Sequence, residues 1–418
     1  MKVAARARWL RFIVLILGGG TIYKLANIKD AFYVPMQQDM GLTHTQIGTM
    51  LSINAIVATV LFVVGGMLAD RFETRKLIPL GLISAGLLGL YMATFPGYSE
   101  MLVIYALLAV CADCIYWPAL LKAIRNLGND DEQGRMFGFL EGGRGIVDTI
   151  VAFSALGVFV AMGSGAQGLK AAIMFYAIIN IVAGVVTWFL LSGSNPTKPA
   201  EVAQTGSLGI VAAMRVPAIW LVSLNVFMVY IVYCGLTYFI PYLKDIYGLP
   251  VALVGAYGII NQYFLKVLGG PTGGFLADKK FHSSSRYIRM AFLALLPIMA
   301  IILMLPPGQA YIFPAMAATL SFAFIVFSMR GVFWAPMSEI GIPSNITGSA
   351  FGLGCLIGYA PGMFAYTVYG AILDRFPGQQ GYTYVFGLMS ILAVIGFLVA
   401  NALSRLIRKQ DITDAVTI

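Results

Sequence analysis

Charged residues are scarce in this sequence of 418 residues: only 11% are Asp, Glu, Lys or Arg, whereas 59% are hydrophobic. A soluble domain carries about 25% charged residues. The composition therefore excludes an ordinary water-soluble protein and indicates a chain that lies in the lipid bilayer. Because about 20 apolar residues are needed for each crossing, the length allows roughly twelve spans.

Cysteine and histidine are also rare. The four cysteines lie in apolar stretches without the spacing of a disulfide framework, and there are only two histidines. We therefore predict no metal site and no cofactor, and we interpret the C-x-x-C pair at Cys111 and Cys114 as small packing residues. The sequence also lacks the G-x-x-x-x-G-K-[ST], H-E-x-x-H and G-x-S-x-G patterns, which disfavours an ATP-driven pump and an intramembrane enzyme.

Apolar runs separated by polar breaks predict twelve membrane-spanning helices. The predicted spans cover residues 11–36, 45–69, 77–95, 100–122, 135–162, 169–192, 218–243, 250–276, 286–305, 310–338, 346–373 and 380–404. A polar, proline-containing stretch at 192–207 holds no span and indicates a linker. We predict an all-α integral membrane protein with six-helix bundles at 1–192 and 218–418, joined by a linker at 193–217.

Lysine and arginine are distributed unevenly between the two ends of the predicted spans. If the N-terminus is cytoplasmic, nineteen of them lie on the inner side and four on the outer side, namely Lys29, Lys170, Lys244 and Arg375. The positive-inside rule then places both termini and the linker in the cytoplasm. Membrane insertion explains the net charge of +9, so we predict no nucleic-acid partner. The start lacks a clear cleavage site, and we expect a monomer that retains its first helix in a bacterial cytoplasmic (inner) membrane.

The two halves of the sequence repeat each other, at an offset of about 206 residues early in each half and about 217 later. The equivalent pairs include Pro35 with Pro241, Asn54 with Asn261, and Trp117 with Trp334. A repeat with the same order of apolar segments predicts two pseudo-symmetric bundles related by an axis along the membrane normal.

A G-x-L-A-D-R/K motif occurs once in each half, at residues 66–71 and 274–279. It resembles the cytoplasmic loop motif of the major facilitator superfamily, and the resemblance covers essentially the whole chain. Stretches such as FLEGGRGIVDT and IGYAPGMF are similar to enterobacterial inner-membrane transporters of this family. The resemblance implies the major facilitator fold and transport by alternating access.

The same resemblance implies a cytoplasmic gating contact that involves Asp70, Arg71 and, in the second copy, Asp278. The first copy departs from the family pattern, because Glu73 stands where the family usually has Gly and Thr74 where it usually has Arg. An alternative interpretation is that Asp70 and Arg71 only stabilise the end of a helix.

Four cations lie inside predicted spans: Lys24, Arg144, Lys266 and Arg330. Ionisable residues at that depth are costly and mark functional sites. Since both halves contribute cations, we predict a binding site for an anionic solute formed by these four residues. For Arg330 the alternative is that its side chain reaches the membrane interface.

Acidic residues are fewer and lie close together in the sequence. Asp113 falls in the predicted fourth span, whereas Glu141 and Asp148 flank Arg144 at helical spacings that place all three side chains on one face. One interpretation is a self-neutralised set of charges. The other is that Asp113, Glu141 or Asp148 exchanges a proton during transport. Lys24 has no opposite charge within one helical turn, so its partner is an acid on another helix or the solute.

Polar side chains are expected to orient the solute. We include Tyr23, Asn54, Asn261 and Tyr359 in the predicted binding site, although aromatic residues in membrane helices often serve packing. The sequence thus favours a proton-coupled secondary transporter for a small organic anion, such as a sugar acid or another carboxylate. The alternatives are an exchanger of organophosphate, sulfonate or inorganic anions, and a sensor that binds solute without moving it.

Overall fold

The computed structural model describes residues 2–127, 133–191, 213–341 and 347–417. Most of the predicted linker, residues 193–212, lies outside the described residues. The described parts of the chain form helices and turns and contain no strand. The prediction of an all-α membrane fold is thereby confirmed.

The chain forms two compact units. Unit 1 comprises Met1–Val202 and Pro250–Phe264, and unit 2 comprises Ala203–Leu249 and Leu265–Ile418. A short segment from the second half of the sequence therefore belongs to unit 1.

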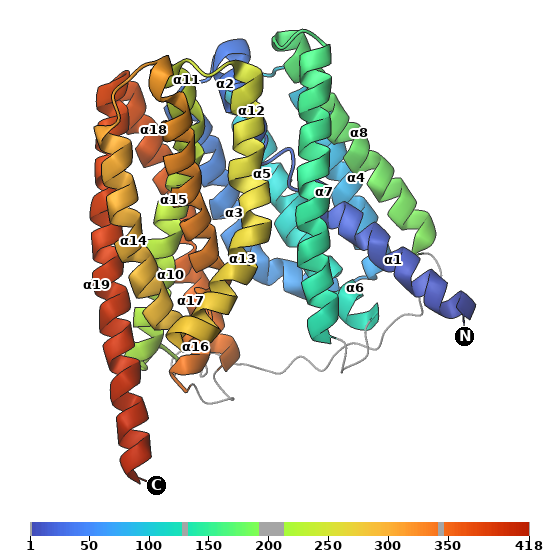
Figure 1. Ribbon diagram of the computed structural model, residues 1–418. Coiled ribbons are helices and arrows are strands. Elements are labelled where there is room, and N and C mark those ends of the chain that lie inside the picture. The colour runs from blue at the N-terminus through green and yellow to red at the C-terminus, as the bar shows by residue number, and fades with distance from the viewer. Residues whose placement is uncertain (1, 128–132, 192–212, 342–346, 418) are drawn as a thin grey trace. The chain divides into compact units, whose positions relative to one another are not determined.

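Unit 1 contains nine α-helices and two π-helices in its described residues. They are α1 (Lys2–Thr21), α2 (Lys29–Met40), α3 (His44–Arg71), α4 (Thr74–Met92), α5 (Tyr98–Ala109), η1 (Val110–Tyr116), α6 (Trp117–Leu127), α7 (Gln133–Ala161), α8 (Ala166–Leu190), α12 (Val251–Ile259) and η4 (Ile260–Phe264). Within this unit α4 packs along α8, and α1 packs against α7 (Figure 1).

The described elements of unit 2 are also helices. Its described elements are α10 (Pro217–Gly235), η3 (Leu236–Tyr238), α11 (Phe239–Tyr247), α13 (Leu265–Phe275), η5 (Leu276–Phe281), α14 (Ser284–Met304), η6 (Gln309–Tyr311), α15 (Ile312–Val332), α16 (Pro336–Glu339), α17 (Thr347–Gly358), η7 (Ala360–Met363), α18 (Ala365–Arg375) and α19 (Gln379–Thr417). The long helix α14 packs against both α15 and α19, and α13 packs against α15 (Figure 1).

Eleven helices of the described residues are long and apolar enough to cross a membrane, and they correspond to the second to twelfth predicted spans. The first predicted span, 11–36, is not among them, because turns at residues 22–28 divide it into α1 and α2. Large apolar side chains such as Phe189, Met304 and Phe313 are exposed by 72% or more. Such exposure is unfavourable in water but suits a surface that faces lipid tails.

Local signals in the sequence explain where several helices begin and end. The Thr43 hydroxyl accepts a hydrogen bond from the Gln46 amide, while the Gln46 side chain accepts one from the Thr43 amide, which fixes the start of α3. Gly41 ends α2 at φ 67° and Gly248 ends α11 at φ 69°. Because this left-handed conformation favours glycine, the sequence repeat is visible in the same turn of both halves.

Candidate functional site

Lys24 lies in the turn that follows α1, and its side chain is only 1% exposed. Its Nζ atom is 2.9 Å from Oδ1 of Asp148 on α7 and donates a hydrogen bond of 2.8 Å to the backbone carbonyl of the same residue. The ring centroid of Tyr263 is 3.5 Å from Nζ. The charge of Lys24 is therefore balanced by an acid on another helix, which is one of the alternatives that the sequence left open.

Arg144 is bound on several sides within unit 1. Its Nε donates to the Gly19 carbonyl at 3.0 Å, and Nη1 is 2.6 Å from Oε1 of Glu141. The guanidinium carbon is 4.5 Å from the Trp117 ring centroid and 5.9 Å from that of Tyr23. A Cβ atom on residue 19 would lie 2.9 Å from Cδ of Arg144. Glycine at this position therefore allows the arginine to pack against the end of α1.

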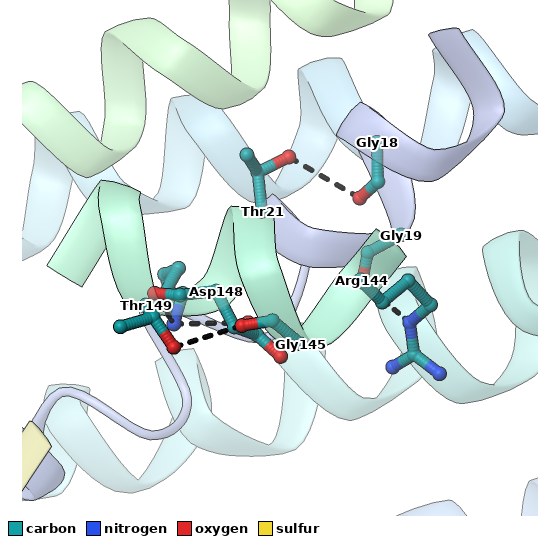
Figure 2. Close-up of polar contacts among 8 residues, drawn as sticks. Gly18, Gly19, Thr21, Arg144, Gly145, Asp148 and Thr149 are labelled. Carbon is teal, nitrogen blue, oxygen red and sulfur yellow. Dashed lines mark hydrogen bonds and ion pairs between the residues drawn. The ribbon is translucent and has the colours of Figure 1, made fainter. Parts of the chain in front are cut away.

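The three charges on α7 do not act as one group. Glu141 pairs with Arg144, whereas Asp148 reaches Lys24 instead, and Figure 2 shows Arg144 and Asp148 directed to different parts of the chain around the end of α1. Their burial differs as well, because the side chain of Glu141 is 53% exposed and that of Asp148 is 12% exposed. The helical spacing places the acids near the arginine but does not determine which cation each of them binds.

Asp113 lies on the π-helix η1, between α5 and α6. Its Oδ1 accepts a hydrogen bond of 3.0 Å from the Tyr23 hydroxyl. Among the described residues no lysine or arginine lies within ion-pair distance of this carboxylate. π-Helical turns are rare and often mark functional positions; the role of Asp113 in transport stays a prediction.

A second buried ion pair was missed by the sequence analysis. Lys29 and Asp30, at the start of α2, form an ion pair and are only 3% and 4% exposed. Lys29, which the charge count put on the outer side, is thus buried within unit 1; the side of the membrane stays a prediction. Neighbouring opposite charges inside an apolar run are the signal that could have shown it, because such a pair neutralises itself and can enter the bundle.

Arg330 lies in the last turn of α15 in unit 2, among aromatic side chains. Its guanidinium carbon is 3.9 Å from the Tyr233 ring centroid and 5.6 Å from that of Tyr230. The Tyr359 ring is 5.0 Å from that of Tyr230, and its hydroxyl accepts a hydrogen bond of 3.1 Å from Nε1 of Trp334. We call these five residues the Arg330 cluster. Arg330 thus contacts aromatic rings of unit 2, and its part in binding stays a prediction.

No carboxylate of the described residues forms an ion pair with Arg330. Within the described part of the chain it takes part in no ion pair, and its buried Nε atom has no hydrogen-bond partner. The ring of Tyr233 covers one face of the guanidinium, which is the usual cation–π arrangement. This arrangement differs from that of Lys24 and Arg144, each of which contacts an acid.

The remaining residues of the predicted binding site lie in less distinctive surroundings. Lys266 is exposed on α13, and Asn261 is fully buried in η4. The Asn54 side chain donates to the backbone carbonyl of Tyr105 at 2.9 Å, so it also joins α3 to α5. Their part in binding stays a prediction.

The first loop motif is held by a lysine from α6. Nζ of Lys122 donates to the Ala69 carbonyl at 2.6 Å and lies 4.0 Å from Oδ1 of Asp70. Arg71 is the exposed last residue of α3, and Asp278 is exposed in η5. A lysine at the carboxyl end of a helix is favourable because the unpaired carbonyls carry partial negative charge.

Two residues that follow the first motif form an ion pair at the surface. Glu73, which departs from the family pattern, pairs with Arg75. The hydrogen bond from Arg75 lowers the pKa of the Glu73 carboxyl.

Comparison with known proteins agrees with this architecture. A sequence model of the Major Facilitator Superfamily matches residues 28–358. The chain belongs to this superfamily. It is therefore a multi-pass membrane transport protein and not an enzyme, as the sequence predicted.

Two relatives from the same bacterium match nearly the whole chain. The protein is 47% identical to the inner membrane protein YihN of Escherichia coli (strain K12), over 98% of this chain and 99% of that protein. It is 31% identical to the inner membrane protein YqcE of the same strain, over 98% of this chain and 97% of that protein. The predicted similarity to enterobacterial inner-membrane transporters of the superfamily is confirmed.

The name of a more distant relative includes a substrate class. The hexuronate transporter of Bacillus subtilis (strain 168) is 22% identical over 93% of this chain and 94% of that protein. Among solved structures, a bacterial homologue of the human lysosomal transporter Spinster superposes with a TM-score of 0.78 at 15% identity, covering 96% of this chain and 98% of that one. At that identity the likeness concerns the fold alone.

The superfamily repeat reveals a relation that the sequence analysis did not draw. The offset that pairs Trp117 with Trp334 also pairs Asp113 with Arg330, so equivalent positions carry opposite charges. The repeat offset itself was the signal that could have found it.

The same offset pairs Lys122 with Glu339. Oε1 of Glu339 accepts a hydrogen bond of 2.5 Å from the Ser284 amide, and Oε2 accepts one of 3.0 Å from the Ser283 hydroxyl. Glu339 thus binds the amino end of α14, whereas Lys122 binds the carboxyl end of α3. Each charge has the sign that its helix end favours.

Proposed function

We propose that this protein is a secondary active transporter that moves a small organic anion, such as a sugar acid or another carboxylate, across the bacterial inner membrane by alternating access. The observation that carries the proposal is Arg330, which contacts tyrosine rings and, among the described residues, no carboxylate. A charge without a counter-ion is costly inside a protein. A solute that supplies a negative charge would remove that cost.

The chemistry of arginine narrows the class of solute. A guanidinium is planar and donates two parallel hydrogen bonds to a carboxylate or phosphate. Because the Tyr233 ring covers one face of Arg330, the N–H edge remains to bind an oxyanion in the plane. The hydroxyl groups of Tyr230 and Tyr359 belong to the same cluster and suit the hydroxyl groups of a sugar acid. The name of the hexuronate transporter supports this class, since a hexuronate is a sugar acid.

Protons are the proposed coupling ion, and Asp113 is the favoured carrier. Protonation of Asp148 would leave the buried Lys24 without its counter-ion, and Glu141 is mostly exposed beside Arg144. Asp113 contacts only the Tyr23 hydroxyl among the polar groups described, so it can gain or lose a proton without breaking an ion pair. Glu141 and Asp148 remain the alternatives.

Several further predictions belong to the same proposal. Lys24, Arg144 and Lys266 would assist binding of the anion, and Asp70 and Arg71 would take part in cytoplasmic gating. The other members of the proposed set are Asp278 for gating, and Asn54, Asn261, Tyr23 and Tyr359 for orientation of the solute. We propose a monomer with both termini in the cytoplasm and bundles at 1–192 and 218–418, because the basic residues and the repeat favour this topology.

A thermal-shift screen of the purified protein tests the anion. D-Glucuronate, D-galacturonate, glycerol 3-phosphate, a sulfonate and nitrate would be compared with neutral D-glucose. A bound ligand raises the melting temperature by mass action, so at least one anion should stabilise the wild type and fail to stabilise Arg330→Gln. Arg286→Gln, which removes an exposed arginine of unit 2, is the matched control. Stabilisation by D-glucose and by no anion would contradict the proposal.

Counterflow in proteoliposomes separates the modes of action. A transporter exchanges labelled D-glucuronate for unlabelled D-glucuronate, whereas a sensor binds it without exchange. Exchange limited to glycerol 3-phosphate, a sulfonate or nitrate would favour the alternative of an anion exchanger.

Accumulation against a gradient tests the proton. Asp113→Asn should keep counterflow but lose proton-driven accumulation, because the neutral side chain cannot carry a proton. Glu141→Gln and Asp148→Asn are tested alongside. Full accumulation by Asp113→Asn, together with its loss in one of the other two variants, would move the coupling role to that residue.

A further inference from the structure

The segment formed by α12 and η4 packs apart from its neighbours in the sequence. Residues Pro250–Phe264 follow α11 in the second half of the sequence, yet they pack in unit 1, where α12 contacts α2 and α7 and η4 contacts α7. The next residue, Leu265, begins α13 and belongs to unit 2. One continuous stretch of helix thus changes its packing partners at residue 264.

Gly255 allows α12 to lie close to unit 1. A Cβ atom at this position would be 2.9 Å from the backbone carbonyl oxygen of Ala31 and 2.7 Å from Cδ1 of Leu156. The carbonyl oxygen belongs to the backbone of α2 and cannot rotate away as a side chain does. Any residue larger than glycine must therefore push α12 away from this position.

The packed surface carries polar groups. Asn261 is fully buried and Gln262 is 5% exposed, and the buried Nε2 atom of Gln262 has no hydrogen-bond partner. An unsatisfied buried amide costs about 1–3 kcal/mol. A permanent core would gain from an apolar residue there, so a polar residue suits a surface that is sometimes exposed to water.

Tyr263 is the residue through which this segment reaches the charges of unit 1. Its ring lies 3.5 Å from Nζ of Lys24, on the π-helical turn η4. Lys24 also binds the carboxylate and the backbone carbonyl of Asp148. With the segment in place, the ammonium group is enclosed by Asp148 and by one aromatic face, which leaves the residue 1% exposed.

We propose that Tyr263 is a positioning residue that controls access to Lys24. When residues 250–264 are packed on unit 1, the Tyr263 ring covers Lys24 and holds it on Asp148; when the segment leaves, Lys24 becomes accessible to the transported anion. The packed segment and an anion on Lys24 then exclude each other. The availability of Lys24 to the anion rests on the proposed function, whereas the control of packing by Tyr263 does not.

Thiol labelling of Leu156→Cys tests the packing directly. Leu156 lies beneath Gly255 and is 7% exposed, so in a variant without the four native cysteines its thiol should react slowly with a water-soluble maleimide. Tyr263→Leu should raise the labelling rate about ten-fold, which corresponds to the loss of a cation–π contact of roughly 1.4 kcal/mol. Tyr263→Phe keeps the ring over Lys24 but loses the hydroxyl contact with Asp30, so it should label more slowly than Tyr263→Leu. Equal rates for all three, or equally raised rates for Phe and Leu, would overturn the proposal.

A pair of glycine variants gives an independent measurement. Gly255→Ala should raise the labelling rate while Tyr263 is intact, because the new methyl group meets the Ala31 carbonyl oxygen. Gly270→Ala is the matched control, since a Cβ atom there has no heavy atom within 4 Å and the same gain in helix propensity applies. Equal rates for the two glycine variants would also contradict the proposal.

D-Glucuronate links the segment to transport. It should raise the labelling rate of the Leu156→Cys protein with wild-type Tyr263, and Lys24→Gln should abolish that increase. If D-glucuronate has no effect while Tyr263→Leu still raises labelling, the control of packing by Tyr263 stands and the anion proposal fails. If D-glucuronate is transported but no Tyr263 variant changes labelling, the present inference fails alone. In transport assays, the KM for D-glucuronate should differ from the wild-type value in Tyr263→Leu and should be close to the wild-type value in Tyr263→Phe.

Discussion

Unit 1 and unit 2 differ in how their cations are surrounded. In unit 1 the cations Lys24, Lys29 and Arg144 each contact a carboxylate. In unit 2 Arg330 contacts aromatic rings instead. Paired charges are satisfied within the protein, whereas an unpaired one has free energy to gain from a ligand. The comparison therefore favours Arg330 as the main contact of the proposed anion, whereas the cations of unit 1 are balanced by acids of the same unit.

Equivalent positions with opposite charges make the contrast sharper. Asp113 and Arg330 occupy the same place in the repeat, each four residues before a tryptophan. Both halves keep the tryptophan, but the local backbone differs, because Asp113 lies on the π-helix η1 and Arg330 on the α-helix α15. Under the proposed function, the acid would carry the proton and the arginine would bind the anion.

The largest expected effect is on stability in unit 1. Lys24→Met removes one partner of a buried ion pair and leaves Asp148 uncompensated, which costs about 3–5 kcal/mol. The melting temperature of the purified protein in detergent should fall clearly. The double variant Lys24→Met/Asp148→Leu should recover most of the loss, because neither charge remains. Lys266→Met, at an exposed position, is the control and should change little. A single variant as stable as the control would mean that the pair is not structural.

The second prediction concerns Arg330 and should show the opposite pattern. Arg330→Met removes a charge that has no acidic partner among the described residues, so the melting temperature should stay the same or rise. Anion binding should weaken by about 100-fold to 10,000-fold, since two hydrogen bonds to a charged group are each worth about 1.5–3 kcal/mol. Isothermal titration with D-glucuronate and thermal unfolding would be measured on the same samples. A loss of stability as large as that of Lys24→Met would place Arg330 among the structural charges.

The sequence predicted the repeat and the spans well because both depend on residues near each other along the chain. Apolar length located eleven spans, and the Gly41 and Gly248 turns follow from local backbone chemistry. The break at residues 22–28 could not be predicted in this way, since the stretch is apolar enough to continue a helix.

The candidate site was predicted only in part, for a physical reason. Helical spacing on α7 gave the pair of Glu141 with Arg144, because both lie on one helix. Which cation pairs with Asp148 depends on how α1 and α7 pack, and the spacing of residues within one helix gives no information about that packing. The ring of Tyr263 above Lys24 comes from a segment more than two hundred residues away in the sequence. No local pattern indicates such a contact.

A smaller effect is expected where Glu339 binds the start of α14. Glu339→Gln keeps the shape but loses the charge that favours amide groups at a helix start, at a cost of about 1–2 kcal/mol. Unfolding by denaturing detergent would measure this loss of free energy. Glu73→Gln serves as the control, because Glu73 is exposed and its ion pair contributes little. If both variants lose the same free energy, the hydrogen bonds to Ser283 and Ser284 are not what stabilises this end of α14.

The smallest effect is expected at the equivalent position in unit 1. Lys122→Met removes the cation from the end of α3, but the side chain is 19% exposed and its distance to Asp70 is 4.0 Å, so the loss should be about 0.5–1 kcal/mol. Lys76→Met is the control, as its amine is also 4.0 Å from an acid but at a more exposed site. Added salt should reduce the Lys122 effect, since exposed charges are screened. A Lys122 effect larger than that of Glu339 would mean that the end of α3, and not the start of α14, is the more tightly held of the two.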